Sequence, residues 1–340
     1  MTPRAGRDHR LTPRAGRDRR PVAWAVSTVA ALVAQAGVVL HHWRSDSPTV
    51  MVLATFAFVA WLCCFVALVA ALRARSVVLT VIALVLVAAG VVQYGPLVGP
   101  PRIFDDDDDP GSGVPLRVMV QNLAFGRAAP HDVVRAVRTG GVDLLMTVEA
   151  TPESADALRT AGLTSLLPHE VASTAPGPEG VAMWSAFPLE SPERIPGFSL
   201  GVLRADMGGP AGPVTVVAVH PVAPVFDGPR AVEEADRLRS YLGSLPGPAP
   251  VVVGGDFNAT WDSVRFRELR GLGYTDSVSA GRDGWVPTWP AGRRLPPVIG
   301  IDHILARGAV GVGETSTVRV DRTDHLGVQA TVRLPAEKVR

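Results

Sequence analysis

Three uncharged apolar segments near the start of the chain constrain its fold more strongly than any other feature. These segments are residues 22–40, 50–72 and 77–94. At a rise of about 1.5 Å per residue, each is long enough as a helix to cross the roughly 30 Å hydrocarbon core of a bilayer. A buried helical hairpin in a soluble core is the alternative, but so many uncharged residues close together disfavour it. We therefore expect three transmembrane helices within residues 21–95.

The distribution of arginine predicts how these segments are oriented. Residues 1–20 hold seven Arg and two Asp, and the short connection at 73–76 holds two more Arg. Short cytoplasmic segments of membrane proteins are enriched in Lys and Arg. We therefore expect residues 1–20 to form a basic, disordered cytoplasmic tail. Three spans across the plasma membrane then leave the rest of the chain on the extracytoplasmic side.

A change of pattern near residue 114 predicts a separate domain. Residues 96–114 include the run DDDDD and have the composition of an acidic linker, whereas short β-branched runs alternate with helical patterns over residues 115–336. The expected strands are residues 116–121, 143–148, 181–185, 202–206, 214–219, 250–254, 302–306 and 328–333. The expected helices are residues 131–139, 152–161, 229–243 and 262–270. Strands this apolar are typical of sheets covered on both faces, so we expect a layered α/β sandwich.

Charge and cysteine content exclude several kinds of site. The whole chain has a net charge of +1, and residues 1–20 and 21–95 contribute +5 and +2, which leaves −6 for residues 96–340. A domain that tracks a nucleic-acid backbone is normally basic, so nucleic acid is a disfavoured partner. Cys63 and Cys64 are adjacent within an apolar segment, which excludes a disulfide framework and a cysteine-based zinc site.

The stretch VVVGGDFNAT, residues 251–260, places polar side chains at the end of an expected buried strand. Asp256 and Asn258 stand two residues apart, so their side chains point to the same side of an extended chain. At the end of a central strand they would project into the crevice where α/β sheets bind ligands. Taken alone, the pair is equally compatible with an ordinary Asx turn.

Other expected strands repeat this arrangement at their ends. The polar residues there are Asn122, Glu149, His220, Asp302 and the pair Asp324-His325. Ligand sets rich in oxygen suit a hard cation such as Mg²⁺ or Mn²⁺. Histidines beside carboxylates suit proton transfer or the stabilisation of a developing negative charge.

The ordered set QN, VE, VH, GGDFNAT, IDHIL and TDH resembles the endonuclease/exonuclease/phosphatase superfamily, the metal-dependent phosphoesterases related to DNase I. The resemblance covers residues 115–335. It implies a four-layer αββα sandwich, the DNase I-like fold, with a divalent-metal site at one end of two packed sheets. The GDFN element and the final Asp-His pair are its most specific parts.

The resemblance also implies a metal-binding set. Glu149 would be the main ligand of Mg²⁺ or Mn²⁺, and Asn122 and Asp324 would complete the metal environment. The sequence departs from the family pattern just before two of these ligands. Val148 replaces Gln before Glu149, and Thr323 replaces Ser before Asp324. Neither change removes an expected ligand.

By the same resemblance, five residues would carry out the chemistry. Asp256 would orient or deprotonate the attacking water, and Asn258 would hold a phosphate oxygen. His325, paired with Asp302, would stabilise the pentacovalent transition state. His220 would contact the phosphate or assist the leaving group.

The order of the segments suggests a substrate class. A few N-terminal spans followed by an extracytoplasmic catalytic domain are similar to membrane members of the superfamily, including those linked to teicoplanin-type antibiotic resistance. This layout suggests a lipid-linked or cell-envelope phosphate, because a site close to the bilayer favours a substrate that stays there. The alternatives are an extracytoplasmic endonuclease or exonuclease and a non-catalytic envelope protein that retains the fold. Trp261, Trp285 and Trp289 either contact substrate or membrane or cap sheet edges.

Overall fold

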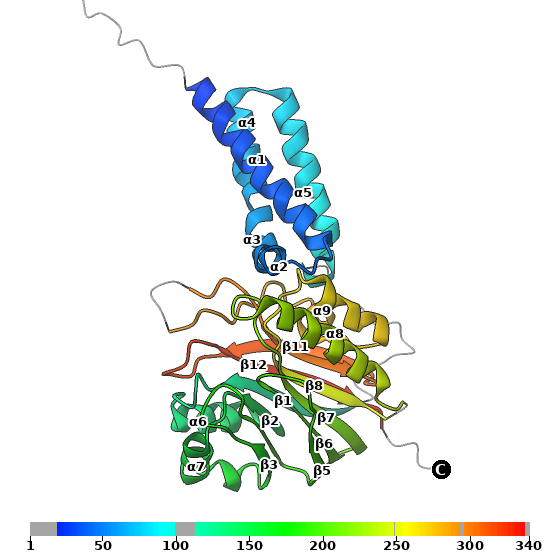
Figure 1. The fold of residues 1–340 in the computed structure, drawn as a ribbon. Helices are drawn as coiled ribbons and strands as arrows, with labels where there is room; N and C mark the ends of the chain where they lie inside the picture. Colours follow the sequence, from blue (N-terminus) through cyan, green and yellow to red (C-terminus); the bar gives the residue numbers. More distant parts are fainter. Residues whose placement is uncertain (1–18, 99–112, 248, 293–295, 337–340) are drawn as a thin grey trace, which may run out of the picture.

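The computed structural model describes residues 19–98, 113–247, 249–292 and 296–336. It consists of a column of N-terminal helices that stands on a layered domain, as Figure 1 shows. Most of the predicted basic tail and most of the predicted acidic linker lie outside the described residues.

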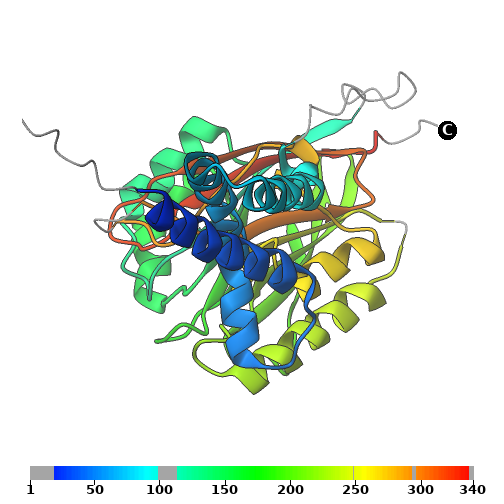
Figure 2. The same cartoon turned by 90° about the horizontal axis from the view of Figure 1, so that it is seen from above.

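Three helices of the column are long and apolar enough to cross a membrane: Arg20–His42, Ala57–Ala74 and Val77–Leu97. The helices are α1 (Arg20–His42), α2 (Pro48–Thr55), α3 (Ala57–Trp61), α4 (Cys63–Ala74) and α5 (Val77–Val98). The candidate second span, formed by α3 and α4, starts at Ala57 and not at residue 50 as expected. The helix is interrupted at Phe56, which has the non-helical backbone angles φ −102° and ψ 10°. Helix α2 is therefore a separate element that lies across the base of the column (Figures 1 and 2).

Small residues allow the helices of the column to approach closely. A Cβ atom on Gly37 of α1 would lie 2.5 Å from the carbonyl oxygen of Ala57, and a Cβ on Gly90 of α5 would overlap the Trp61 ring. The Ser27 hydroxyl donates a hydrogen bond of 2.9 Å to the carbonyl oxygen of Ala67. Close contacts between small residues and hydroxyl–backbone bonds are typical of helices that pack within a bilayer.

The described part of the domain contains two six-stranded sheets. The first sheet has the order β11 (Gly311–Val318), β12 (Gly327–Leu334), β1 (Val114–Asn122), β2 (Leu144–Val148), β4 (Val181–Ser185) and β3 (His169–Ser173). The second has the order β5 (Leu189–Arg194), β6 (Gly201–Gly209), β7 (Gly212–His220), β8 (Val251–Asp256), β10 (Asp302–Arg307) and β9 (Thr275–Asp276). Strands β1 and β2 are parallel, as are β7 and β8, and all other neighbouring pairs are antiparallel.

The sheets and helices form the predicted four-layer αββα sandwich. Side chains that alternate along β1 separate the layers, because Val118 and Val120 belong to the core between the sheets and Met119 belongs to the core beneath the helices. Helices α6 (Pro130–Gly140) and α7 (Pro152–Thr160) cover the first sheet, and α8 (Gly228–Ser244) and α9 (Val264–Glu268) cover the second. The remaining short helices are η2 (Leu163–Ser165), η3 (Leu269–Leu272) and α10 (Ser277–Gly281).

All eight expected strands are present, but four others were not predicted. The unpredicted strands are β3, β5, β9 and β11, and all except β9 are largely exposed or only partly buried. Each lies at the edge of a sheet. An edge strand buries little apolar surface, so its sequence lacks the continuous apolar run that identified the central strands.

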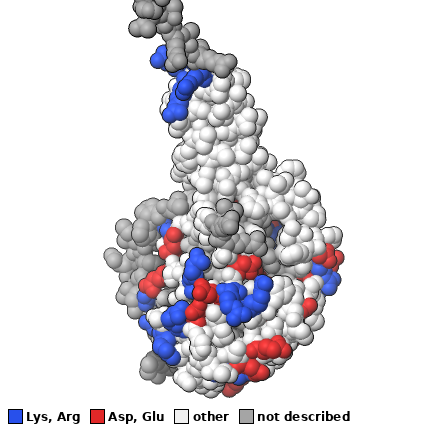
Figure 3. Space-filling model, turned by 90° about the vertical axis from the view of Figure 1, so that its left-hand side faces the viewer, with Lys and Arg blue, Asp and Glu red and all other residues white. Residues whose placement is uncertain are grey.

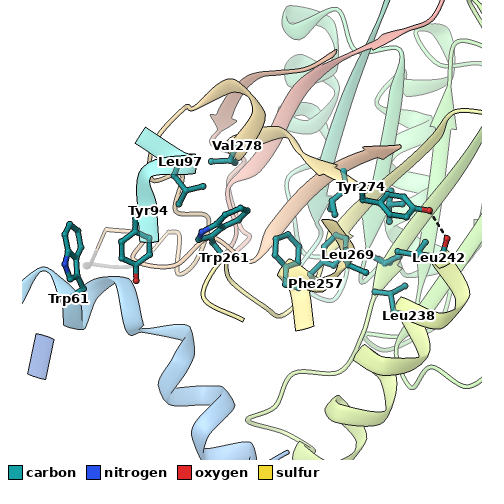
Figure 4. Packing of buried hydrophobic residues seen from close by; sticks show 14 of the residues in the cluster. Trp61, Tyr94, Leu97, Leu238, Leu242, Phe257, Trp261, Leu269, Tyr274 and Val278 are labelled. Atoms are coloured by element: carbon teal, nitrogen blue, oxygen red, sulfur yellow. Dashed lines mark hydrogen bonds between the residues drawn. The ribbon is translucent and has the colours of Figure 1, made fainter. Parts of the chain in front are cut away.

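The column and the domain share one continuous hydrophobic core. Trp61, Tyr94 and Leu97 from the column belong to the same buried cluster as Phe257 and Trp261 from the domain, and Figure 4 shows these side chains in one row. The loop that contains Phe257 and Trp261 follows β8 directly. The column therefore contacts the chain segment that contains the GDFN motif.

A single carboxylate joins all three candidate spans to this loop. Asp262 is only 2% exposed. Its Oδ1 atom lies 2.7 Å from His41 Nδ1 in α1 and 2.8 Å from the Tyr94 hydroxyl in α5. Its Oδ2 atom accepts a bond of 3.1 Å from the backbone N–H of Phe58 in the first turn of α3. This last bond satisfies an N–H group that has no partner within its own helix and explains why a new helix starts there.

Candidate active site

The predicted site residues meet at one edge of the sandwich. Four strands end at this edge, namely β1, β2, β7 and β8, because each of the two parallel pairs places its carboxyl ends together. Strand β10 is antiparallel to β8 and begins there, so that Asp302 lies opposite Asp256. Strand β12 is antiparallel to β1 and also begins at this edge, directly after Asp324 and His325.

Two glycines bring the strands close enough for these side chains to meet. A Cβ atom on Gly255, which has φ +152°, would lie 1.9 Å from the carbonyl oxygen of Val219 in β7. A Cβ atom on Gly254 would lie 2.7 Å from Val120 and 2.9 Å from Met146, both in the opposite sheet. The glycine pair therefore sets the spacing of the strands and of the sheets beside Asp256.

Asn122, Glu149 and Asp256 form the centre of the site. The Asn122 amide donates hydrogen bonds of 3.0 Å to Glu149 Oε1 and 3.1 Å to Asp256 Oδ2. The other oxygen of Glu149 accepts a bond of 2.7 Å from the backbone N–H of Phe125. Asn122 thus holds two carboxylates from different sheets side by side.

His325 and Asp302 form the predicted pair. The His325 Nδ1 atom lies 2.8 Å from Asp302 Oδ2, and its Nε2 atom lies 3.7 Å from Asp256 Oδ2. A carboxylate can only accept, so Nδ1 carries a proton and Nε2 faces the centre of the site. Burial alone lowers the pKa of His325, but the charges of Asp302 and Asp256 outweigh it and raise the pKa to about 10. His325 is therefore a fixed cationic donor at neutral pH.

His220 has the opposite character. Its Nδ1 atom lies 3.2 Å from the carbonyl oxygen of Pro178, so Nδ1 carries the proton, and its Nε2 atom lies 3.8 Å from Asp256 Oδ2. Burial lowers the pKa of His220, although the charge of Asp256 opposes the shift. In this state His220 is neutral and presents an acceptor nitrogen to the site.

The two remaining predicted residues make their side-chain bonds elsewhere. The Asn258 amide donates 3.0 Å to the carbonyl oxygen of Pro221, while the backbone N–H of Asn258 donates 2.8 Å to Asp256 Oδ1. Asp324 Oδ2 accepts a bond of 3.3 Å from Trp289 Nε1. Both residues lie at the site edge, but neither has the direct side-chain contact with Glu149 or Asp256 that Asn122 has.

Comparison with known proteins shows the family of the chain. Residues 119–325 match the Endonuclease/Exonuclease/phosphatase family. The chain belongs to this family. Its members are phosphoesterases and nucleases, so the chain is classed with the phosphoric ester hydrolases. No curated protein matches the sequence significantly.

Several solved structures share the fold of this chain at low sequence identity. A humanized D. rerio TDP2 has a TM-score of 0.53 and 16% identity, and the match covers 64% of this chain and 99% of that one. A truncated Caenorhabditis elegans TDP2 has a TM-score of 0.51 and 17% identity, with 64% and 98% covered. The endonuclease/exonuclease/phosphatase protein of Beutenbergia cavernae has a TM-score of 0.51 and 21% identity, with 66% and 73% covered.

The oxygen donors at this candidate site fit a hard divalent cation. Ligand atoms of Asp256, Asp302 and His325 lie within 4.8 Å of one another, but His325 in its cationic state cannot be a ligand, which leaves the two carboxylates of this cluster as candidate metal ligands. The Oδ1 atom of Asp302 is buried without a hydrogen-bond partner among the described residues. Burial raises the pKa of Glu149, and burial together with Asp302 raises the pKa of Asp256. An oxygen-rich cluster in which carboxylates resist ionisation is the environment that a bound Mg²⁺ or Mn²⁺ would stabilise.

Backbone strain concentrates at the same edge of the sheets. Ala124, Phe125, Glu149 and Asn258 all have left-handed φ angles, between 48° and 58°. Left-handed conformations are unfavourable for residues with side chains and cluster at functional sites. At Phe125 this geometry directs the backbone N–H toward Glu149 and leaves the aromatic ring exposed.

The sequence analysis did not identify Thr288, which supports the site. The fully buried Thr288 hydroxyl accepts hydrogen bonds from the backbone N–H groups of Ile301 and Asp302, at 3.1 and 3.3 Å. Of the three tryptophans singled out above, Trp289 lies at the site, whereas Trp261 is buried at the junction with the column. Thr288 stands in a loop without an apolar pattern, so no local signal marks it.

Proposed function

We propose that the protein is a membrane-anchored, divalent-metal-dependent phosphoesterase that hydrolyses a lipid-linked or cell-envelope phosphate ester. The continuity of the site with the column supports this proposal most directly. Asp256 ends β8, and the loop that follows contains both Asn258 and Asp262, which accepts a hydrogen bond from each candidate span. The loop that would bind the phosphate is therefore fixed to the helices that would cross the bilayer.

Charge at the far end of the column supports the proposed orientation. On the face that Figure 3 shows, the column is uncharged along its length and basic residues lie at its end remote from the domain. Helix α1 begins at Arg20, and the connection between α4 and α5 contains Arg75. Basic residues mark the cytoplasmic end of membrane helices, so the N-terminus would be cytoplasmic and the domain extracytoplasmic.

The mechanism assigns a role to each group at the site edge. A divalent cation held by Glu149, Asn122 and Asp324 would neutralise phosphate charge and polarise the P–O bond. Asp256 would orient or deprotonate the water, since its carboxylate lies between two histidine rings. Asp302 holds the ring of His325 with Nε2 facing the site.

The remaining groups would act on the phosphate itself. His325 would donate its Nε2 proton to the phosphate oxygen that gains charge in the transition state. Asn258 would hold a second phosphate oxygen. His220 would contact the phosphate or assist the leaving group, and its acceptor nitrogen would first have to gain a proton in order to donate.

A nuclease is the competing function. One solved D. rerio TDP2 structure, similar to this chain with a TM-score of 0.53 and 16% identity, contains a single-strand DNA product. The run at 105–109 contributes five negative charges to the net charge of −6 over residues 96–340, so the domain itself is close to neutral. It lacks the basic balance that binding to a nucleic-acid backbone normally requires. A family member that retains only the fold is a further alternative, and the cluster of hydrogen-bonded acids and histidines argues against it.

Phosphate release by the purified full-length protein in detergent tests the proposal. The substrates would be undecaprenyl pyrophosphate, a sphingomyelin-type phosphodiester, and single- and double-stranded DNA, each with Mg²⁺ or Mn²⁺. Asp256→Ala and His325→Ala should abolish lipid phosphate release, whereas Asp206→Ala and His169→Ala, on β6 and β3, should retain it. DNA cleavage that is lost in the first two variants would instead favour the nuclease. An absence of metal-dependent activity on every substrate would contradict the proposal.

A further inference from the structure

Helix α2 covers the loop that follows β7. The loop, residues 221–227, connects the end of β7 at the candidate site to the start of α8 (Figures 1 and 2). Pro48 at the start of α2 packs so tightly on Gly228 that a Cβ atom there would lie 2.0 Å from the proline ring. The apolar helix α2 is therefore held between the column and the site.

Two hollows beneath α2 adjoin each other. Both are lined by Met51 of α2, by Pro224 of the loop, and by Asn258 and Ala259 of the GDFNAT segment. Because they share these walls, we treat the two hollows together as the α2 groove. Asn258 of the candidate site lines both hollows, and Trp43 lines the second.

Two residues that line the α2 groove indicate what it could connect. Asn258 is the residue expected to hold a phosphate oxygen. Trp43 is the first residue after α1 and is 54% exposed, so it marks the end of the first candidate span. Tryptophan is enriched at this boundary between hydrocarbon and water. The groove would thus connect the site to the surface of the bilayer.

The lining of the α2 groove is suited to hydrocarbon. Apolar side chains form most of its walls. Both arginines in the lining have acidic partners, because Arg265 pairs with Asp46 and Asp236 and Arg44 pairs with Asp236 and Glu268. On the adjacent loop, Val225 is 68% exposed and Phe226 is 85% exposed. Consecutive exposed apolar side chains in the loop beneath α2, at the base of the column, fit contact with lipid better than contact with water.

We infer that the α2 groove binds the first part of the hydrocarbon chain of a membrane lipid whose phosphate ester lies in the candidate site. This inference rests on the proposed function and narrows its substrate class to phosphate esters that keep their chains in the bilayer. The hydrocarbon chain would pass beneath α2 and leave past Trp43, while the phosphate reaches Asn258 without the lipid leaving the membrane. The α2 groove would recognise the hydrocarbon chain of the lipid, and the residues at the sheet edge would act on its phosphate.

A matched pair of substitutions in α2 tests the groove. Met51→Trp would fill it, whereas Leu53→Trp adds the same side chain at a position of the same helix that is 52% exposed and does not line it. Met51→Trp should raise KM for a long-chain phosphate ester about tenfold, the effect of losing contact with about two buried CH₂ groups. Leu53→Trp should leave KM unchanged, and neither variant should affect a short-chain ester with the same headgroup. Equal losses on both esters, or equal losses in both variants, would overturn the inference.

A binding measurement separates the groove from the proposed reaction. A long-chain phosphate ester with a photoreactive group on its chain should crosslink to residues 48–55 or 221–226 of the full-length protein in detergent. Met51→Trp should reduce the amount of this crosslinked product. If Met51→Trp lowers the unfolding temperature, Met51→Phe, which adds less volume, would be used as the variant instead. Crosslinking there without phosphate release would retain the groove and refute the proposed function. Crosslinking only elsewhere, or only to a second copy of the chain, would refute the groove.

Discussion

Replacing Asp262 by alanine tests whether the column and the domain form a single folded unit. The wild-type carboxylate is buried and accepts hydrogen bonds from His41, Tyr94 and the backbone N–H of Phe58, at 2.7, 2.8 and 3.1 Å. The substitution removes all three bonds at once. It also leaves three donors at the junction without their acceptor.

The loss of unfolding free energy can be estimated from these contacts. A buried donor left without an acceptor costs about 1–3 kcal/mol, so three such donors together cost about 3 kcal/mol or more. Each kcal/mol shifts the Tm of a domain of this size by about 2–4 °C. Asp262→Ala should therefore lower Tm by about 6 °C or more. Because the loop that contains Asp262 also contains Asn258 and directly follows Asp256, activity should also fall.

Thermal unfolding of the detergent-solubilised protein measures this effect. Asp46→Ala is the matched control, since Asp46 pairs with Arg265 at the same junction but its side chain is 76% exposed. Arg265 is buried but keeps Asp236 and the carbonyl oxygen of Ser45 as partners. Loss of the exposed Asp46 carboxylate should therefore cost at most about 1 kcal/mol, and the control should unfold close to the wild-type temperature. If Asp262→Ala has the same unfolding temperature as the Asp46→Ala control and retains full activity, the junction does not couple the column to the site.

Three further substitutions test the site. Asp302→Asn removes the charge that supports the histidine cation, so kcat should fall about 10²–10³-fold with little change in KM, and an unchanged kcat would contradict the pairing. Chelation of divalent ions should abolish phosphate release, and Glu149→Gln should raise the Mg²⁺ concentration for half-maximal activity about tenfold or more; activity that survives chelation would refute the metal requirement. Gly255→Ala places a Cβ atom 1.9 Å from a backbone oxygen and should destabilise the fold by about 3 kcal/mol or more, whereas a Cβ on Gly271 meets nothing within 4 Å. Denaturant unfolding of Gly255→Ala beside Gly271→Ala measures the difference, and equal stability would refute the close-approach argument.

The central elements of the fold could be predicted because burial leaves a mark on the sequence. Strands such as β8 are apolar along their whole length, since the layers on both sides exclude water. Strand β11, with the sequence GVGETSTV, is half exposed at an edge and has no such mark. The break at Phe56 was also invisible, because the bond that favours it comes from Asp262, far away in the sequence.

The candidate site could be predicted in outline for a related reason. Parallel strand pairs place their carboxyl ends at one edge, so polar residues after buried strands come together even when they are distant in sequence. Asn122, Glu149 and Asp256 meet in this way. The supporting contacts of Thr288 and the junction at Asp262 depend on loops and tertiary packing, which no spacing pattern encodes. Their roles follow only from the assembled structure.

Phosphate release in reconstituted vesicles tests the central claim most directly. The full-length protein would be placed in one population of vesicles, with a long-chain lipid phosphate ester either in the same vesicles or in separate ones. We predict Mg²⁺-dependent release from the lipid in the same bilayer, at a far higher rate than from lipid in separate vesicles, and its loss in Asp256→Ala. Equal rates from both populations, or faster cleavage of added DNA than of the lipid, would contradict a site that acts on substrates within its own membrane.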